Sequence, residues 1–123
     1  MENNILIVDD DAYLLNVLVL ILRTEGYHIE TSLSGEVLLK KMLYNPDLII
    51  LDRQLSDLDG AEICKGLKKE DETKNIPVIL ISAGSGLRDI AKDAGADDYI
   101  EKPFDSHELR DKVKHMLSKR KCY

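Results

Sequence analysis

The chain has 123 residues, a length typical of one domain, and its 44% hydrophobic content is enough to form one packed core. A formal net charge of −6 argues against a dedicated nucleic-acid surface, because duplex binding requires Lys and Arg that neutralise several phosphates. The N-terminus lacks the positive charge of a secretory signal, and its first apolar run, Ile5 to Val8, is far too short to span a bilayer. We therefore expect one cytoplasmic domain over residues 1–123, with no membrane partner.

The first half of the chain alternates short apolar runs with helical patterns. In chain order, the predicted elements are a strand at Ile5 to Val8, a helix at Tyr13 to Glu25, a strand at Tyr27 to Ser32, a helix at Gly35 to Tyr44 and a strand at Leu48 to Leu51. Gly26 lies where the C-cap of the first helix would precede the second strand, and Asp11 is a favoured N-cap for that helix.

The second half continues the alternation. The predicted elements are a helix at Ala61 to Lys69, a strand at Val78 to Ile81, a helix at Leu87 to Ala94 followed by Gly95 as its C-cap, a strand at Asp98 to Ile100 and a helix at Ser106 to Lys119. Strands without polar alternation are buried on both faces, which is typical of a parallel sheet covered by crossover helices. We predict a doubly wound α/β fold of the flavodoxin-like type, with five parallel strands in the order 2-1-3-4-5.

Polar residues follow the predicted strands at the edge where ligands bind in such sheets. They are Asp9, Asp10 and Asp11 after the first strand, Asp52 after the third, Ser82 after the fourth, and Lys102 with Pro103 after the fifth. Strands one and three are neighbours in this order, so Asp52 should lie close to Asp9 and Asp10. Carboxylates at about 4 Å repel by roughly 4 kcal/mol at an effective dielectric near 20, and a hard divalent cation is their natural counter-ion.

An acidic Mg²⁺ site beside a lysine and a hydroxyl contains the parts that phosphoryl transfer requires. Mg²⁺ and Lys102 would neutralise phosphoryl oxygens, the Ser82 hydroxyl would donate a hydrogen bond, and Asp52 would be the nucleophile that forms an aspartyl phosphate. The spacing alone does not show which carboxylate attacks.

The polar segments at the strand ends carry a family resemblance over essentially the whole chain. They read Ile-Val-Asp-Asp-Asp at 7–11, Leu-Asp at 51–52, Asp-Gly at 59–60, Ser-Ala at 82–83 and Gly-Ala-Asp-Asp-Tyr-Ile-Glu-Lys-Pro-Phe at 95–104. This set resembles the receiver domain of two-component response regulators, and the last segment is its most specific part.

The resemblance implies a phosphorylation-dependent signalling switch that catalyses only its own phosphorylation and dephosphorylation. Asp52 would accept phosphate from a sensor histidine kinase or a histidine phosphotransfer protein. Asp9, Asp10, Asp52 and the backbone carbonyl of Gln54 would bind Mg²⁺, and Ser82 and Lys102 would contact the phosphoryl group.

The resemblance also implies how phosphorylation reaches a partner. Ser82 would reorient and Tyr99 would turn inward, which remodels the face formed by the fourth helix, the fifth strand and the fifth helix for a downstream effector. The peptide bond before Pro103 would be cis.

Two features depart from the family pattern. Arg53 and Gln54 replace the apolar pair that often follows the phosphoacceptor, and Arg53 places a cation directly beside the pocket. The segment from Ser82 to Gly95 is about two residues shorter than in the family, and it contains the fourth helix, whose face the family often uses to recognise partners.

Structural roles compete with several of these assignments. Asp11 serves a helix as an N-cap at least as readily as it binds metal, Tyr99 is also compatible with a core-edge aromatic, and Pro103 with the start of the last helix. Cys64 and Cys122 lack disulfide or metal-ligand spacing and are interpreted as ordinary thiols.

Three other functions use the same fold. A small aspartate-nucleophile phosphatase usually has a second carboxylate two residues after the nucleophile, where this chain has Gln54. A flavodoxin-type cofactor domain would need a first turn that is not acidic. A phosphate-independent receiver-like module would signal by protein contact alone, although every pocket residue type is present here.

Overall fold

The protein, described from a computed structural model over residues 3–38 and 46–121, alternates strands and helices along its length. The elements are β1 (Asn4–Val8), α1 (Ala12–Arg23), β2 (His28–Ser32), the 3-10 helix η1 (Gly35–Leu38), β3 (Leu48–Asp52), α2 (Gly60–Lys69), β4 (Val78–Ser82), α3 (Leu87–Ala94), β5 (Asp98–Glu101) and α4 (Ser106–Lys121). The labels α3 and α4 therefore denote the fourth and fifth helices predicted from the sequence.

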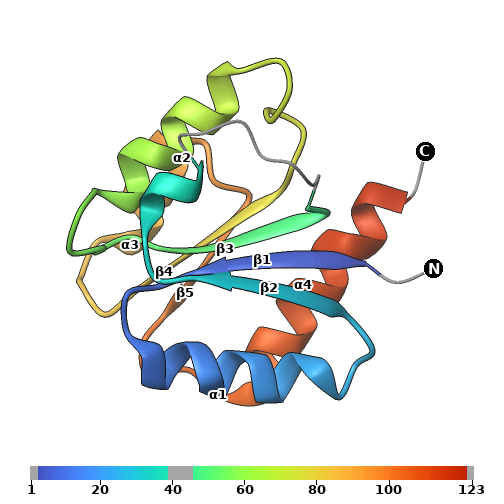
Figure 1. The fold of residues 1–123 in the computed structure, drawn as a ribbon. Helices are drawn as coiled ribbons and strands as arrows, with labels where there is room; N and C mark the ends of the chain where they lie inside the picture. The colour runs from blue at the N-terminus through green and yellow to red at the C-terminus, as the bar shows by residue number, and fades with distance from the viewer. Residues whose placement is uncertain (1–2, 39–45, 122–123) are drawn as a thin grey trace.

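All neighbouring strands pair in parallel, in the order β2-β1-β3-β4-β5, which confirms the predicted topology. Helices α1 and α4 cover one face of the sheet, and α2 and α3 cover the other (Figure 1). The fold is thus a doubly wound sheet, and its switch point lies between β1 and β3.

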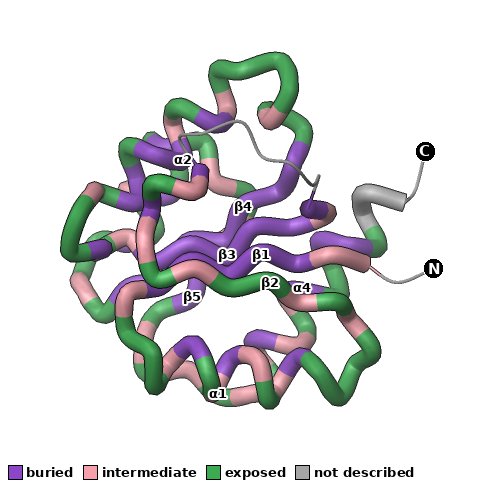
Figure 2. Tube along the Cα trace, in the orientation of Figure 1, coloured by how far each residue is buried: buried purple, intermediate pink, exposed green. Residues whose placement is uncertain are grey.

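The sheet separates two hydrophobic clusters because successive side chains of a strand point to opposite faces. In β3, Ile49 and Leu51 pack toward α2 and α3, whereas Leu48 and Ile50 pack toward α1 and α4. The central strands are buried along their length, and the edge strand β2 is more exposed (Figure 2). Burial on both faces explains why the central strands contain continuous Ile, Leu and Val.

Local caps fix where the helices begin and end. Asp11 caps α1 by accepting hydrogen bonds from the backbone of Tyr13 and Leu14, as predicted for an N-cap. Gly95 ends α3 with φ at 79°, which confirms the predicted C-cap. Gly26 differs from the prediction: α1 ends at Arg23 with Thr24 as its C-cap, and Gly26, at φ 84°, forms the turn into β2.

Element boundaries differ from the predictions in two informative ways. Strands β3 and β4 extend one residue further than predicted and include Asp52 and Ser82, because the parallel ladder continues into these polar residues. The helix predicted at Gly35–Tyr44 begins as a 3-10 turn over Gly35–Leu38, and positions 39–44 of that prediction lie outside the described residues.

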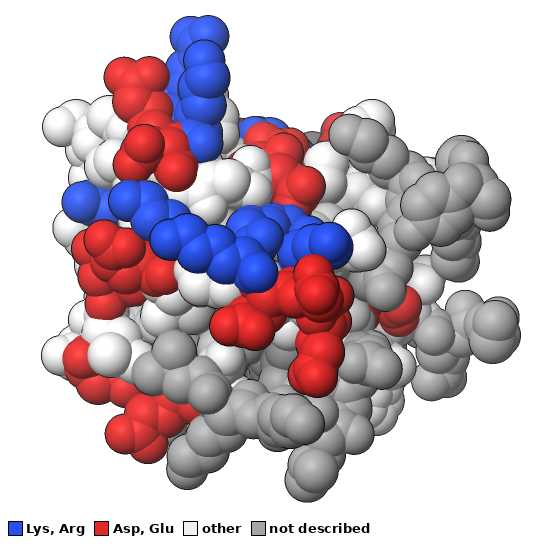
Figure 3. All heavy atoms as spheres, turned by 90° about the horizontal axis from the view of Figure 1, so that it is seen from above, with Lys and Arg blue, Asp and Glu red and all other residues white. Residues whose placement is uncertain are grey.

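Charged side chains of both signs intermingle on the face that carries α2 (Figure 3). Lys65 pairs with Asp93 at 3.2 Å, and Lys74 pairs with Asp71 at the same distance. This face therefore presents alternating charge rather than a patch of one sign. Within the described residues, no helix combines the length and apolar character that crossing a bilayer requires.

Candidate functional site

The carboxyl ends of four adjacent strands bring the predicted polar residues to one rim of the sheet. Asp9 directly follows β1, Asp52 and Ser82 are the last residues of β3 and β4, and Lys102 directly follows β5. Backbone hydrogen bonds continue the ladder to the rim, since Arg53 N donates to the Ile81 carbonyl at 2.9 Å and Lys102 N donates to the Ser82 carbonyl at 2.9 Å.

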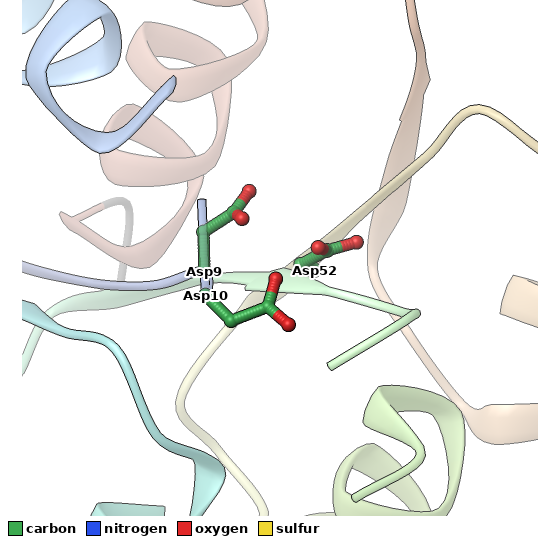
Figure 4. Close-up of side chains that lie close together, drawn as sticks. All are labelled: Asp9, Asp10 and Asp52. Carbon is green, nitrogen blue, oxygen red and sulfur yellow. The ribbon is translucent and has the colours of Figure 1, made fainter. Parts of the chain in front are cut away.

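Three carboxylates gather where β1 and β3 end (Figure 4). Asp9, Asp10 and Asp52 each place one carboxylate oxygen within 4.8 Å of the others. Asp9 and Asp52 are only 1% and 5% exposed, and Asp10 is the least buried of the three. The structure thus brings together the acids predicted from the strand ends, whereas Asp11 serves as the cap of α1.

Backbone N–H groups orient these carboxylates. Asp11 N donates to Asp9 Oδ1 at 2.9 Å, and Gln54 N donates to Asp52 Oδ1 at 3.1 Å. Ser56 N donates to Asp10 Oδ2 at 2.7 Å, which ties the loop after β3 to the loop after β1. Each acid therefore keeps an oxygen that is free of these backbone bonds.

Lys102 supplies positive charge to the cluster. Its Nζ lies 3.7 Å from Asp9 Oδ2 and 3.8 Å from Asp52 Oδ2, which is close enough for an ion pair but too long for a hydrogen bond. One lysine does not balance three acids. The pKa of Asp9 is raised from 3.8 to about 6, chiefly by burial and also by the Asp52 charge, whereas the hydrogen bond from Asp11 N and the Lys102 charge act to lower it.

The acid cluster fits a hard divalent cation. All donor atoms are oxygens, and Asp9 Oδ2 is buried without a hydrogen-bond partner. A buried carboxylate oxygen that lacks a partner is costly, and Mg²⁺ would satisfy it while relieving the repulsion between the acids. Asp9, Asp10 and Asp52 are the side chains that could hold the ion; the predicted ligation by the Gln54 carbonyl stays a prediction.

Ser82 lies on the far side of Asp52 from β1, whereas the Lys102 ammonium reaches both Asp52 and Asp9. The Ser82 side chain is 1% exposed, and its Oγ accepts a hydrogen bond from Gly84 N at 3.0 Å. The peptide bond between Lys102 and Pro103 is cis, the conformation that the family resemblance implies. Because β4 is the neighbour of β3, Ser82 is placed beside Asp52 rather than beside Asp9.

Tyr99 lies in the edge strand β5, whereas the acids lie at the ends of β1 and β3. The Tyr99 side chain is half-buried and packs against the hydrophobic cluster between the sheet and helices α2 and α3. Lys112 Nζ, from α4, lies 4.9 Å from the centroid of its ring and donates a hydrogen bond to the Tyr99 carbonyl at 2.5 Å. The same ammonium pairs with Asp98 at 3.2 Å, so α4 is anchored to β5 beside this ring.

The sequence reasoning gave no role to Gly60, which the structure places at the site. A Cβ at this position would lie 2.1 Å from the Asp52 carbonyl oxygen and 2.8 Å from Arg53 Cα, so only glycine allows α2 to begin against the end of β3. Asp59 caps this helix by accepting from Ala61 N at 2.9 Å. The Asp59-Gly60 pair in the sequence was a signal that could have pointed to this position. The close approach of Gly60 to the end of β3 depends on tertiary packing, which the sequence does not display.

The structure therefore defines a class: a doubly wound parallel sheet with a buried acid cluster at its switch point and a lysine and a serine beside it. Residues 5–114 match the family model of the response regulator receiver domain. The chain belongs to this family.

Known proteins support this membership. The chain is 38% identical to the phosphate regulon transcriptional regulatory protein PhoB of Rhizobium meliloti, over 98% of this chain and 55% of that protein. It is 35% identical to the DNA-binding dual master transcriptional regulator RpaA of a Synechocystis strain, over 92% of this chain and 48% of that protein. The chain thus spans about half the length of these curated relatives.

A similar solved structure is the signal receiver domain of a signal transduction histidine kinase from Syntrophus aciditrophicus. It superposes with a TM-score of 0.90 at 36% identity, and the match covers 98% of this chain and 94% of that one. A CheY-like receiver domain protein from Methanospirillum hungatei superposes with a TM-score of 0.88 at 31% identity, covering 98% of both chains. These matches agree with the flavodoxin-like order of the sheet.

Proposed function

We propose that this receiver domain is switched by phosphorylation of Asp52 in a site that binds Mg²⁺. The observation that supports this most strongly is the buried acid cluster with Lys102 beside it. The strand order favours Asp52 as the acceptor over Asp9. A phosphoryl group on β3 would lie next to Ser82 on β4, whereas Asp9 on β1 lies further from β4. Lys102 lies close to both acids, at 3.8 Å from Asp52 and 3.7 Å from Asp9, and would serve a phosphoryl group on either.

Each residue of the site would have its own part in this reaction. Asp52 attacks the phosphorus atom of the donor with a carboxylate oxygen, and the Gln54 N–H holds the other oxygen. Lys102 neutralises negative charge on the transferred group, and the Ser82 hydroxyl donates to one of its oxygens. Mg²⁺, when bound by Asp9, Asp10, Asp52 and the Gln54 carbonyl, supplies further charge neutralisation at the phosphoryl oxygens.

The proposed output follows from the connection between Ser82 and Tyr99. Ser82 ends β4 and Tyr99 lies in the adjacent β5, so a movement of the hydroxyl toward a phosphoryl group changes the packing next to this ring. We expect the face of α3, β5 and α4 to respond, and this face to contact a downstream effector. The phosphate donor would be a sensor histidine kinase or a histidine phosphotransfer protein in the cytoplasm.

A phosphatase that acts on external substrates is the competing enzyme class. Such an enzyme usually needs a general acid two residues after its nucleophile, and this position holds the exposed amide Gln54, which has no acidic proton to donate. The geometry therefore favours a switch that turns over only its own aspartyl phosphate.

The test is phosphorylation of the purified chain with acetyl phosphate and Mg²⁺, followed by intact mass. We expect one phosphoryl group on the wild type, none on Asp52→Asn, and none when EDTA removes the metal. Unchanged labelling of Asp52→Asn would contradict the assignment. Rapid turnover of a generic phosphate ester by the wild type would favour the phosphatase instead.

A further inference from the structure

Arg53, the residue after Asp52, directs its guanidinium toward the loop that follows β4. Gly84 in that loop has no side chain, and a Cβ there would lie 3.5 Å from Arg53 Nη1, 3.5 Å from Ser82 Oγ and 3.7 Å from Gln54 Nε2. The guanidinium, the hydroxyl and the amide thus surround the space that Gly84 leaves open. A larger residue at 84 would occupy that space.

The Arg53 guanidinium has no acidic partner in the part of the chain that the structure describes. Arg53 is half-buried and its Nε is buried without a hydrogen-bond partner, yet it joins none of the ion pairs found among those residues. The nearby carboxylates are instead oriented by backbone N–H groups and approached by Lys102. A half-buried cation without a partner is costly, and an anionic ligand would offset that cost.

The guanidinium of Arg53 lies beside the loop after β4, near the Ser82 hydroxyl, and Arg53 is less buried than Asp52. Asp52 and Ser82 are buried, Arg53 and Gly84 are half-buried, and Gln54 is exposed. Phosphoryl transfer requires the attacking and leaving atoms to lie roughly in line with phosphorus. Because Asp52 is buried, the leaving group must lie on the solvent side of the phosphoryl group.

We propose that Arg53 binds the leaving group of the phosphate donor and favours donors whose leaving group is anionic, an inference that rests on Asp52 as the proposed acceptor. With an acyl phosphate, Asp52 forms a bond to phosphorus and the bond to the acyl oxygen breaks, so that a carboxylate departs with the electron pair. With phosphoramidate, the phosphorus–nitrogen bond breaks, and the already protonated nitrogen departs as neutral ammonia.

The guanidinium attracts a departing carboxylate but gains little from ammonia. The imidazole of a phosphohistidine also leaves without negative charge, so Arg53 acts chiefly on small acyl phosphates. A guanidinium suits this ligand because it presents parallel N–H donors to the two oxygens of a carboxylate.

The experiment compares acetyl phosphate and phosphoramidate as donors to the wild type, Arg53→Gln and Arg53→Lys, with Mg²⁺ present. We expect Arg53→Gln to lower the labelling rate with acetyl phosphate about tenfold, which corresponds to about 1.4 kcal/mol. The rate with phosphoramidate should change less than about twofold. Arg53→Lys keeps the positive charge but lacks the planar guanidinium. Its labelling rate with acetyl phosphate should lie between those of the wild type and Arg53→Gln.

A second pair of variants tests the same charge from the opposite loop. Gly84 does not adopt the left-handed conformation, and an added Cβ would meet only ordinary contacts, so side chains are tolerated there. Gly84→Glu should lower the preference for acetyl phosphate, because the new carboxylate pairs with Arg53. The neutral control Gly84→Gln should change the labelling rates with both donors by the same factor.

The outcomes separate this inference from the proposed function. An equal loss with both donors in Arg53→Gln, or no change with either, would overturn the role of Arg53 while leaving Asp52 as the acceptor. Absence of label from both donors on the wild type would instead contradict the proposed acceptor and would overturn the inference with it.

Discussion

The three aspartates of the rim differ in burial and in their hydrogen bonds. Asp9 is buried with one oxygen that lacks a hydrogen-bond partner, whereas Asp10 accepts from Ser56 N and is the least buried. Asp52 is buried, with Asp9 at the end of the neighbouring β1, Ser82 at the end of the neighbouring β4, and Lys102 at 3.8 Å. These separate environments support the proposed division, in which Asp9 and Asp10 bind metal and Asp52 is the nucleophile.

Asp9 should make the metal-free protein less stable as pH rises. Its pKa in the folded chain, about 6, exceeds the ordinary value of 3.8, so its contribution to stability is complete below pH 3.8 and is lost as pH rises through 6. In EDTA, we expect the free energy of unfolding of the wild type to fall by about 2 kcal/mol relative to Asp9→Asn between pH 4 and 7.5. Urea denaturation at both pH values measures this difference.

Mg²⁺ supplies the control for the Asp9 prediction. Adding Mg²⁺ at pH 7.5 should stabilise the wild type and leave Asp9→Asn nearly unchanged, because the ion offsets the buried charge only where the carboxylate is present. If the two proteins show the same pH dependence of stability in EDTA, Asp9 does not have the raised pKa on which this prediction rests.

The start of α2 shows how an element positions the site. Gly60 N donates to the Arg53 carbonyl at 2.7 Å, and the glycine itself lies against the backbone of Asp52. The helix therefore begins directly on the segment that carries the acceptor. A side chain at position 60 would push β3 and α2 apart.

Gly60→Ala should destabilise the protein by about 3 kcal/mol, because the added methyl meets backbone atoms that cannot move independently. The matched control is Gly66→Ala in the same helix, where a Cβ meets no atom within 4 Å. That change should stabilise the protein by about 0.5–1 kcal/mol through helix propensity. Equal effects in thermal denaturation would contradict the close packing inferred at Gly60.

Lys68 on α2 makes hydrogen bonds at the end of the sheet opposite the rim that carries the acids. Lys68 Nζ donates to the Ile76 carbonyl at 2.8 Å and to Asp97 Oδ2 at 2.7 Å, and the same Asp97 oxygen accepts from Val78 N at 2.8 Å. Its side chain is only 18% exposed. These bonds join α2 to the starts of β4 and β5.

Lys68→Met should cost roughly 2 kcal/mol, since it removes charge-assisted hydrogen bonds from partly buried acceptors. Lys74→Met is the control: its pair with Asp71 is exposed and should contribute less than about 1 kcal/mol. Chemical denaturation of both variants measures the contrast, and a Lys68 effect as small as that of Lys74 would refute the structural role.

At the scale of the whole molecule, the strand order and the rim residues were predictable because apolar runs ended at polar side chains. Asp52, Ser82 and Lys102 follow such runs, and a parallel sheet aligns the ends of its strands. Their roles in phosphoryl transfer remain proposals. The gathering of the acids was predictable for the same topological reason, although their distances were not.

Features that depend on packing between distant segments could not be predicted from the sequence. Gly35 begins a 3-10 turn where a Cβ would lie 2.7 Å from Ile63 Cδ1, and no local pattern distinguishes that turn from the start of an α-helix. The approach of the Arg53 guanidinium to Gly84 likewise joins loops after different strands. Side-chain direction in such loops is set by tertiary contacts that a single sequence does not display.

The most direct test of the central claim is the chemical location of the phosphoryl group. The wild type is labelled with acetyl phosphate and Mg²⁺, reduced with borohydride, which converts an aspartyl phosphate into homoserine, and digested for peptide mass spectrometry. We predict that homoserine appears at Asp52 and at no other aspartate of the rim. Homoserine at Asp9 or Asp10, with Asp52 unmodified, would contradict the assignment of Asp52 as the phosphoacceptor.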